Sequence, residues 1–194
     1  CFIQLLPKGW VRGAVASSAA TTRALKKRGI RVAPMLPSRK LAVYVDGADE
    51  ADPRLRLIKG GGGALTREKI IASMAKEFIC ICDESKQVQQ LGKFPLPIEI
   101  IPLAQSAVSK SLAQLGGEAV LRLNSSGKAI GQPYLTDNGG WILDVQKLTI
   151  KDPLALESQI NQIPGVISVG LFAKRKADLL LLGTGQTVQS IRFD

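Results

Sequence analysis

The stretch VDGADEADPRLRLIKGGGGALTREK, residues 45–69, decides both the fold class and the place of the functional site. It continues from residues 41–45 (LAVYV), a short run of β-branched and aromatic side chains that predicts a buried strand. The acidic side chains that follow this strand are Asp46, Asp49 and Glu50. Open α/β sheets bind ligands outside the carboxyl ends of their strands, so these acids indicate a site for a small molecule.

The second half of the stretch joins a lysine to a glycine bend. Lys59 precedes four glycines at 60–63, and residues 64–66 can cap a helix that carries Glu68 in its first turn. Glycine permits positive φ and close backbone approach, so the amides of this run can face an anion. No GK[ST] follows, which excludes a Walker loop. The apolar flanks favour a buried bend, although a flexible linker would have the same composition.

Composition narrows the chemistry. The 194 residues suffice for one domain or two small ones, and 45% of them are apolar, as in a folded protein. There is no histidine, so proton chemistry must fall to carboxylates and lysines. No apolar run approaches the roughly 20 residues that span a bilayer, and the start lacks the order of a signal peptide. We therefore expect a cytoplasmic protein with no membrane partner.

The net charge of +10 favours anionic partners, either a phosphorylated metabolite or nucleic acid. The densest basic cluster, within residues 26–31, ends a predicted amphipathic helix, where cations complement the macrodipole and face solvent. No RNP-like, zinc-finger or helix-turn-helix pattern accompanies the charge, so we expect no nucleic-acid partner. Cys80 and Cys82 alternate inside FICIC, where they fit a pleated strand better than a metal site.

Predicted strands and helices alternate in the first half of the chain, which indicates a parallel sheet with helical crossovers. The strands are residues 12–16, 30–33, 41–45 and 78–82, and the helices are residues 18–28 and 66–76. The three prolines of PLPIEIIP, residues 95–102, break this rhythm and begin a second unit.

The second unit repeats a strand, helix, strand order and resembles a small ferredoxin-like layer. Its strands are residues 98–101, 119–123, 134–136, 142–147 and 166–171, and its helices are residues 103–115 and 153–160. A last strand, 177–182, is expected to return to the first sheet. The predicted fold is therefore α/β. A Rossmann-like, mostly parallel sheet domain comprises residues 1–95 and 172–194, and a smaller α+β domain with a candidate role in oligomerisation comprises residues 96–171.

Long ungapped strings recur at consistent spacing over nearly the whole chain: VDGADE, LIKGGGGALTREKI, DESK, GKFPLP, TDNG, ILDV and IPGVISVGLFA. Together they resemble the type A ribose-5-phosphate isomerase family. The resemblance implies interconversion of ribose 5-phosphate and ribulose 5-phosphate in the pentose phosphate pathway, without a metal or an organic cofactor. It also implies a phosphosugar as the small-molecule substrate and a cytoplasmic homo-oligomer, either a homodimer or a homotetramer.

The resemblance also implies a role for each residue in a matching motif. Glu68 of TREK would be the general base that moves a proton between C2 and C1 through an enediolate. Asp46 and Asp49 would contact sugar hydroxyls, one of them assisting ring opening, and Lys59 would stabilise the oxyanion. A carboxylate can remove a carbon-bound proton only if the enediolate oxygen is stabilised nearby, and a fixed ammonium does that. The other expected substrate contacts are Gly47, Ala48, Gly60, Gly61, Gly62 and Lys86.

Simpler interpretations stay open from the residues alone. The two aspartates could end a strand in an Asx turn, Glu68 could be an ordinary first-turn acid, and Lys86 could be a solvated lysine. The TDNG residues Thr136, Asp137 and Asn138 are typical of a turn, and we place them outside the site.

Two other functions compete with the isomerase. One is a non-catalytic phosphosugar-binding regulator. Family members begin earlier, with a GTGST-like loop that binds the sugar phosphate, and residues 1–6 resemble the helix after it, so true absence of that loop would favour the regulator. The other is an RNA-binding module based on the net charge, which predicts salt-sensitive affinity for oligonucleotides.

Overall fold

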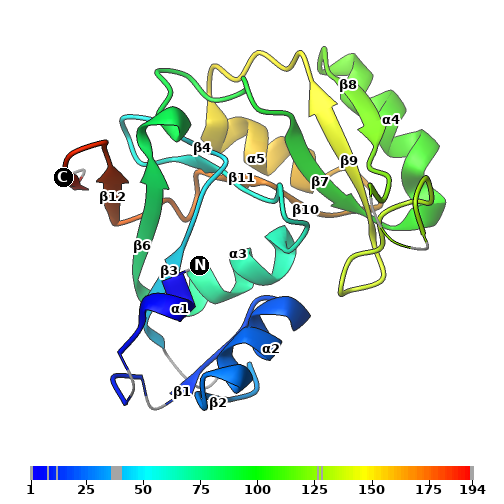
Figure 1. Ribbon diagram of the computed structural model, residues 1–194. Coiled ribbons are helices and arrows are strands. Elements are labelled where there is room, and N and C mark those ends of the chain that lie inside the picture. The colour runs from blue at the N-terminus through cyan, green and yellow to red at the C-terminus, as the bar shows by residue number, and fades with distance from the viewer. Residues whose placement is uncertain are drawn as a thin grey trace.

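The computed structural model describes residues 2–7, 9–11, 13–35, 41–125, 127 and 129–192. These residues form two four-stranded sheets, a three-stranded sheet and a pair of short strands. Figure 1 shows α3 (Leu65–Met74) near the centre of the molecule. The four-stranded sheet that contains β7 (Leu96–Ile100) and β9 (Trp141–Gln146) lies above it together with its helices, and the short pair of β1 (Gly13–Ala14) and β2 (Arg31–Val32) lies below it.

The first sheet is mostly parallel, as predicted. Its strands lie in the order β13-β12-β6-β3, and β3, β6 and β12 run parallel, whereas β13 forms a hairpin with β12. These strands are β3 (Leu41–Asp46), β6 (Ala75–Asp83), β12 (Leu179–Gly183) and β13 (Val188–Arg192). The pairing of β12 with β6 confirms that the C-terminal strand returns to the first sheet.

The N-terminal elements form a separate parallel pair. They are α1 (Phe2–Leu5), β1 (Gly13–Ala14), α2 (Ala19–Lys27) and β2 (Arg31–Val32). Ser18 caps α2 as expected, because its hydroxyl accepts a hydrogen bond from the amide of Thr21 at 3.0 Å. The helix ends before Gly29, whose φ of 71° suits only glycine without strain. Arg12, the first residue of the predicted strand 12–16, lies outside the described residues.

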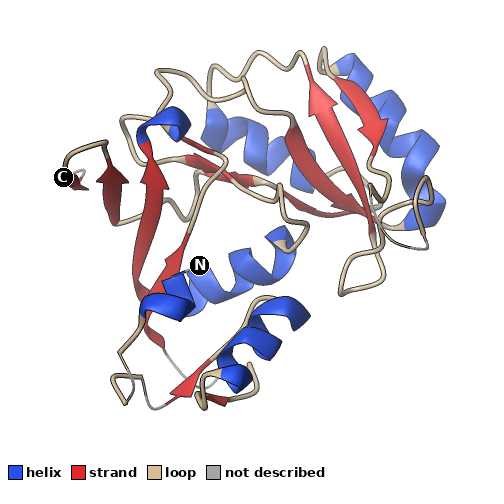
Figure 2. Ribbon diagram, viewed as in Figure 1, coloured by secondary structure: helices blue, strands red, loops and turns tan. Residues whose placement is uncertain are grey.

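The second sheet has the ferredoxin-like topology that the element order predicted. Its four strands are all antiparallel to their neighbours and lie in the order β10-β7-β9-β8, which places the fourth strand first, followed by the first, third and second. The elements are β7 (Leu96–Ile100), η2 (Pro102–Ala104), α4 (Gln105–Gln114), β8 (Glu118–Leu121), β9 (Trp141–Gln146), α5 (Pro153–Asn161) and β10 (Val166–Val169). Figure 2 shows α4 and α5 beside this sheet, and side chains of both helices enter its buried core.

A short third sheet links the two larger ones. It consists of β4 (Glu50–Ala51), β5 (Leu57–Ile58) and β11 (Leu171–Phe172), in the order β11-β5-β4. The predicted strand 166–171 is therefore divided at Gly170, whose amide donates to the carbonyl of Pro97 and whose carbonyl accepts from the amide of Lys59. A Cβ at position 170 would lie 2.3 Å from the Lys59 carbonyl oxygen, so only glycine fits here.

Two local predictions are wrong. The predicted strand 134–136 does not form, because Thr136 enters a turn, with its amide bonded to the carbonyl of Gly140 and its hydroxyl bonded to Glu99. Residues 64–66 also provide no side-chain cap for α3, since the helix begins at Leu65 and the Thr66 hydroxyl donates to Glu99 instead.

The two four-stranded sheets have separate buried cores. One core lies between the second sheet and its helices, and Ile58 and Leu91 of the first segment pack into it. The other lies between the first sheet and α3. We retain the division into 1–95 with 172–194, and 96–171, as a proposal that follows the two large sheets. Among the described helices, none has the length and apolar character needed to cross a bilayer.

Candidate active site

Lys59 lies at the centre of a buried charged cluster. It directly follows β5, and its amide is fixed by the carbonyl of Gly170 at 2.9 Å. Its Nζ lies 3.0 Å from Asp46 Oδ2, 3.2 Å from Glu68 Oε2 and 2.5 Å from the carbonyl oxygen of Gly47. Only 3% of the residue is exposed, so these contacts replace water around the ammonium. Positions 46, 59 and 68, to which the resemblance assigns parts of one reaction, therefore lie together in the structure.

Asp46 is held from three sides. Its Oδ2 accepts hydrogen bonds from Lys59 and from the hydroxyl of Tyr44, and its Oδ1 accepts from the amide of Gly47 at 2.9 Å. Tyr44 lies two residues earlier in β3, so both side chains project from the same face of the strand. Burial, and then the charges of Asp46 and Glu68, raise the pKa of Tyr44, which keeps the phenol as a neutral donor. Tyr44 was not predicted, although the two-residue spacing could have indicated it.

Glu68 is the least satisfied member of the cluster. It lies in the first turn of α3, and its amide donates to the carbonyl of Ala64 at 3.0 Å. The contact of its Oε2 with Lys59 is an ion pair without hydrogen-bond geometry, so this buried oxygen accepts no hydrogen bond from the described residues. Burial raises the pKa of Glu68; the ammonium acts against burial, and the charges of Asp46 and Asp49 add to it.

The pKa values of Lys59 and Glu68 are both raised, and both shifts suit proton transfer. Burial by itself lowers the pKa of Lys59, but the carboxylates of Glu68 and Asp46 outweigh burial and raise it, so the ammonium stays charged. A raised pKa makes the Glu68 carboxylate a stronger base than a solvated one. The cluster thus pairs a carboxylate base with a fixed positive charge.

Asp49 connects the acidic turn to the glycine run. Its Oδ2 accepts a hydrogen bond from the amide of Gly61 at 2.7 Å. The run is a closed turn, in which the amide of Gly63 donates to the carbonyl of Gly60 at 2.9 Å and both of these glycines have positive φ. Its two ends are buried, whereas Gly61 and Gly62 are exposed. The expected buried bend is therefore buried only at its ends, and its middle is open to a ligand.

The structure does not bring every predicted residue to the cluster. Lys86 ends η1 (Glu84–Lys86), which follows β6, and it makes no hydrogen bond or ion pair with the cluster among the described residues. Ala48 packs against the core of the first sheet. Glu50, which the sequence placed at the same strand end, is buried and accepts hydrogen bonds from the amides of Gly92 and Phe94, so its carboxylate serves the fold.

Two residues next to the second sheet reach the site, and neither was predicted from the sequence. The Arg122 guanidinium donates to the carbonyls of Gly60 and Gly61 at 2.9 and 3.0 Å, and the Tyr134 hydroxyl donates to the carbonyl of Gly62 at 3.3 Å. Farther away, Thr136 and Asn138 donate to the buried carboxylate of Glu99. The TDNG residues thus support the fold beside α3.

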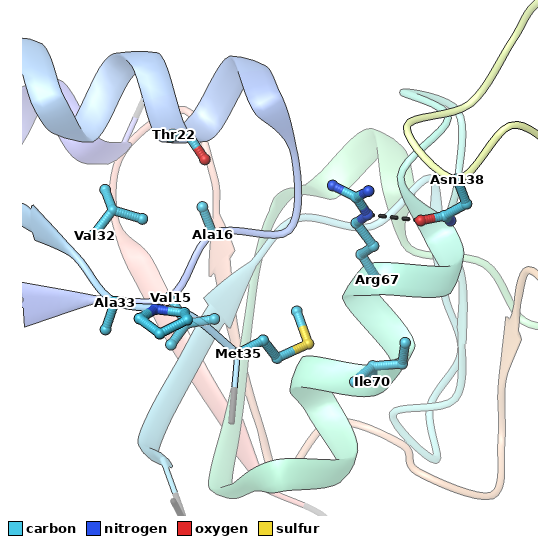
Figure 3. A pocket seen from close by; sticks show the side chains of 10 residues that line it. Val15, Ala16, Thr22, Val32, Ala33, Met35, Arg67, Ile70 and Asn138 are labelled. Atoms are coloured by element: carbon cyan, nitrogen blue, oxygen red, sulfur yellow. Dashed lines mark hydrogen bonds between the residues drawn. The ribbon is translucent and has the colours of Figure 1, made fainter. Parts of the chain in front are cut away.

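A cavity of about 400 Å³ lies beside α3, and Arg67 and Ile70 of that helix line part of it. Figure 3 shows that apolar side chains such as Val32 and Met35 line most of it, while Arg67 donates a hydrogen bond to Asn138 at its rim. None of its lining residues belongs to the charged cluster. Among the described residues, no group of three or more His, Cys, Asp or Glu side chains is placed to hold a metal ion.

Comparisons with known proteins agree on one family. The sequence model of ribose 5-phosphate isomerase A (phosphoriboisomerase A) matches residues 13–187. Ribose-5-phosphate isomerase A of Polynucleobacter asymbioticus is 57% identical over 198 residues, which cover 98% of this chain and 84% of that protein. The crystal structure of ribose 5-phosphate isomerase A from Neisseria gonorrhoeae superposes with a TM-score of 0.91 at 44% identity, covering 98% of this chain and 82% of that one. The enzyme from Methanocaldococcus jannaschii gives a TM-score of 0.86 at 35% identity, covering 99% and 95% of the two chains.

Proposed function

Because the chain belongs to the ribose 5-phosphate isomerase A family, we propose that Glu68, Lys59 and the two neighbouring aspartates carry out its reaction. The reaction is the interconversion of ribose 5-phosphate and ribulose 5-phosphate, an aldose–ketose isomerisation of the pentose phosphate pathway. The observation that supports this assignment is the contact of one buried ammonium with two partly buried carboxylates.

Glu68 is the general base in this proposal. In the open-chain aldose its carboxylate removes the proton from C2, and the electron pair moves toward the carbonyl at C1 to give an enediolate. The same carboxyl group then returns the proton to C1, while a proton passes from the C2 hydroxyl to the C1 oxygen to leave the ketose. Burial and the single ion-pair contact of Glu68 support this role, because burial raises its pKa and no described residue besides Lys59 contacts its Oε2 as a donor.

Lys59 stabilises the enediolate oxygen. Its ammonium is already fixed by Asp46 and by the carbonyl of Gly47, so little reorganisation is needed when negative charge develops on the sugar. Its raised pKa keeps it protonated through the reaction. An ammonium in a site with little water acts more strongly than one in solvent, because the effective dielectric constant is lower.

Asp46 and Asp49 contact the sugar hydroxyls, and one of them assists ring opening. The amide of Gly62, in the exposed middle of the turn, holds the substrate, with Gly47, Ala48, Gly60 and Gly61 as further backbone contacts. A Cβ at Gly62 would meet nothing within 4 Å, which leaves room for a ligand over this part of the turn. Lys86, half-buried after β6, completes the site when substrate is present.

The test is turnover in deuterated water with a Glu68→Gln variant. The parent chain should convert ribose 5-phosphate and introduce solvent deuterium at the reacting carbon, and Glu68→Gln should lose both activities. Glu118→Gln is the matched control, since it makes the same substitution in an exposed ion pair with Lys147. Conversion by Glu68→Gln at the parent rate would show that another group is the base. Binding of ribose 5-phosphate by the parent without any ketose would instead indicate a regulator, which the isomerase relatives do not favour.

Two further features are proposed on the same basis. We propose that the protein acts in the cytoplasm and assembles as a homodimer or a homotetramer, because its motifs resemble an enzyme family with these properties. Light scattering coupled to gel filtration would give the mass of the assembly, and a monomer at micromolar concentration would contradict the second proposal.

A further inference from the structure

Arg122 lies just beyond β8 and joins the smaller domain to the glycine turn. Its Nε and Nη2 donate to the two carboxylate oxygens of Asp144 on β9, at 2.8 and 2.5 Å. Its Nη1 donates to the carbonyls of Gly60 and Gly61, at 2.9 and 3.0 Å. The side chain is 15% exposed, so these contacts are shielded from water. Asp144 therefore fixes the plane of the guanidinium, and the remaining nitrogen holds the turn.

Tyr134 completes the same attachment. The Arg122 guanidinium lies over its ring, 5.9 Å from the centroid, and its hydroxyl donates to the carbonyl of Gly62 at 3.3 Å. A Cβ at Gly63 would lie 2.4 Å from this hydroxyl, so the ring packs closely on the turn. Three successive carbonyls of the glycine turn thus accept hydrogen bonds from the smaller domain.

Holding a carbonyl also directs the next amide. In a trans peptide the C=O and the following N–H point in opposite directions within one plane. The carbonyl of Gly60 therefore sets the direction of the Gly61 amide, which donates to Asp49 at 2.7 Å. The carbonyl of Gly61 likewise sets the direction of the exposed Gly62 amide. Arg122 orients both peptide planes from the side opposite to Asp49.

We propose that Arg122 is a positioning residue of the isomerase: it aligns the glycine turn, and through it Asp49, for the substrate. This inference rests on the proposed role of that turn and of Asp49 as substrate contacts. Arg122 touches neither Glu68 nor Lys59 among the described residues, so the proton-transfer pair keeps its own geometry without it. Loss of Arg122 should weaken substrate binding and leave the ionisation of the base unchanged.

The variants are Arg122→Met, which keeps the length without the charge, and Arg122→Lys, which keeps the charge without the fork. The control is Lys147→Met, which removes a nearby cation whose ion pair with Glu118 is exposed. Arg122→Met should lower kcat/KM about 10- to 100-fold, mainly through KM, because small misplacements of substrate-binding groups have effects of this size. Arg122→Lys should recover part of the loss, since one ammonium cannot bridge Asp144 and two carbonyls. Lys147→Met should behave as the parent.

The pH dependence and the melting temperature separate positioning from stability. The acid limb of the kcat profile should stay where it is in the parent. A folded Arg122→Met variant with parental KM, whether or not its Tm falls, would overturn the proposal, as would a shift of the acid limb. If Arg122→Met does not fold, the KM of Arg122→Lys decides in the same way. A raised KM for ribose 5-phosphate in an Arg122 variant, together with full activity in Glu68→Gln, would retain the positioning role and reject only the proposed base.

Discussion

Replacing Glu68 by glutamine is expected to stabilise the fold near neutral pH while removing activity. The Lys59 ammonium contacts two carboxylates, so the buried cluster carries one negative charge in excess. Glu68 contributes that excess, and its Oε2 accepts no hydrogen bond from the described residues. Glutamine keeps the shape and removes the charge, which leaves a neutral ion pair between Lys59 and Asp46.

The size and the pH dependence of this effect follow from the same contacts. Single stabilising substitutions commonly gain about 0.5–2 kcal/mol, and active sites often hold groups that cost stability, so a gain of this size is expected. Each kcal/mol raises Tm by about 2–4 °C in a chain of this length. Because the pKa of Glu68 is raised, the folded state binds its proton at pH values where the unfolded state has lost it. The free-energy cost of holding Glu68 charged in the folded state is absent below pH 4.5, the ordinary pKa of this carboxyl group. It grows as the pH rises through the pKa that Glu68 has in the folded state. The difference in Tm between Glu68→Gln and the parent should therefore be largest near neutral pH and small in acid.

Asp46→Asn is the matched comparison, since it also removes one negative charge from the cluster but is expected to lower the stability of the fold. Asp46 accepts hydrogen bonds from Lys59, Tyr44 and the amide of Gly47, and an amide in its place would turn an NH₂ group toward donors. A donor turned toward other donors costs about 1–3 kcal/mol in a buried site, and less here because 29% of the Asp46 side chain is exposed. Thermal unfolding followed by circular dichroism over a pH series measures both variants, and the coupled isomerase assay should show a loss of about 10²–10⁴-fold for Glu68→Gln. If Glu68→Gln melted as low as Asp46→Asn, or if its Tm difference from the parent did not change with pH, the reasoning would be refuted.

Three further predictions use the same contacts. Lys59→Met should lower the free energy of unfolding by about 3–5 kcal/mol, measured in urea, because it leaves buried carboxylates unpaired; it should also move the acid limb of residual activity to higher pH, since the ammonium lowers the pKa of Glu68. Gly170→Ala should cost about 1–3 kcal/mol by overpacking against the Lys59 carbonyl, whereas Gly62→Ala, with nothing within 4 Å, should unfold at nearly the parental urea concentration. Glu99→Gln should cost about 1–3 kcal/mol in the same assay, because its amide would face three side-chain donors. Equal midpoints for the two glycine variants, or a parental midpoint for Lys59→Met or Glu99→Gln, would contradict the corresponding contact.

The sequence could locate the charged cluster because its parts lie at the ends of predictable elements. A predicted apolar strand ends at Asp46 and Glu68 lies in the first turn of a predicted helix, whereas the two-residue strand just before Lys59 was not predicted. These positions meet because the carboxyl ends of strands and the amino ends of the following helices share one edge of an α/β sheet. Sequence periodicity thus predicts near which end of an element a side chain lies, to within a few residues.

The direction in which a side chain points is harder to predict than the part of the fold in which it lies. Glu50 follows the same strand as Asp46, but it belongs to the two-residue β4, and its carboxylate turns to the amides of Gly92 and Phe94. Arg122 lies about sixty positions from the glycines that it holds, and nothing in its local sequence marks it, because the contact depends on how two sheets pack. Residues 134–136 are too few for hydrophobic periodicity to distinguish a strand from a turn. In the structure Thr136 donates a hydrogen bond to the buried carboxylate of Glu99, and this contact fits a turn.

The unequal satisfaction of the buried carboxylates gives a reason for the function of Glu68 that does not depend on family resemblance. Glu50 accepts two backbone amides, Glu99 accepts three side-chain donors, and Glu157 accepts two amides and the ammonium of Lys69. Buried polar groups are normally satisfied in this way, because an unmet acceptor costs more than a hydrogen bond returns. Glu68 departs from the pattern with one ion pair, a buried oxygen without a hydrogen bond and a raised pKa. A fold that surrounds its buried glutamates with donors and leaves Glu68 with one ion pair keeps a base available for substrate, since a carboxylate surrounded by several donors could not readily accept a proton from carbon.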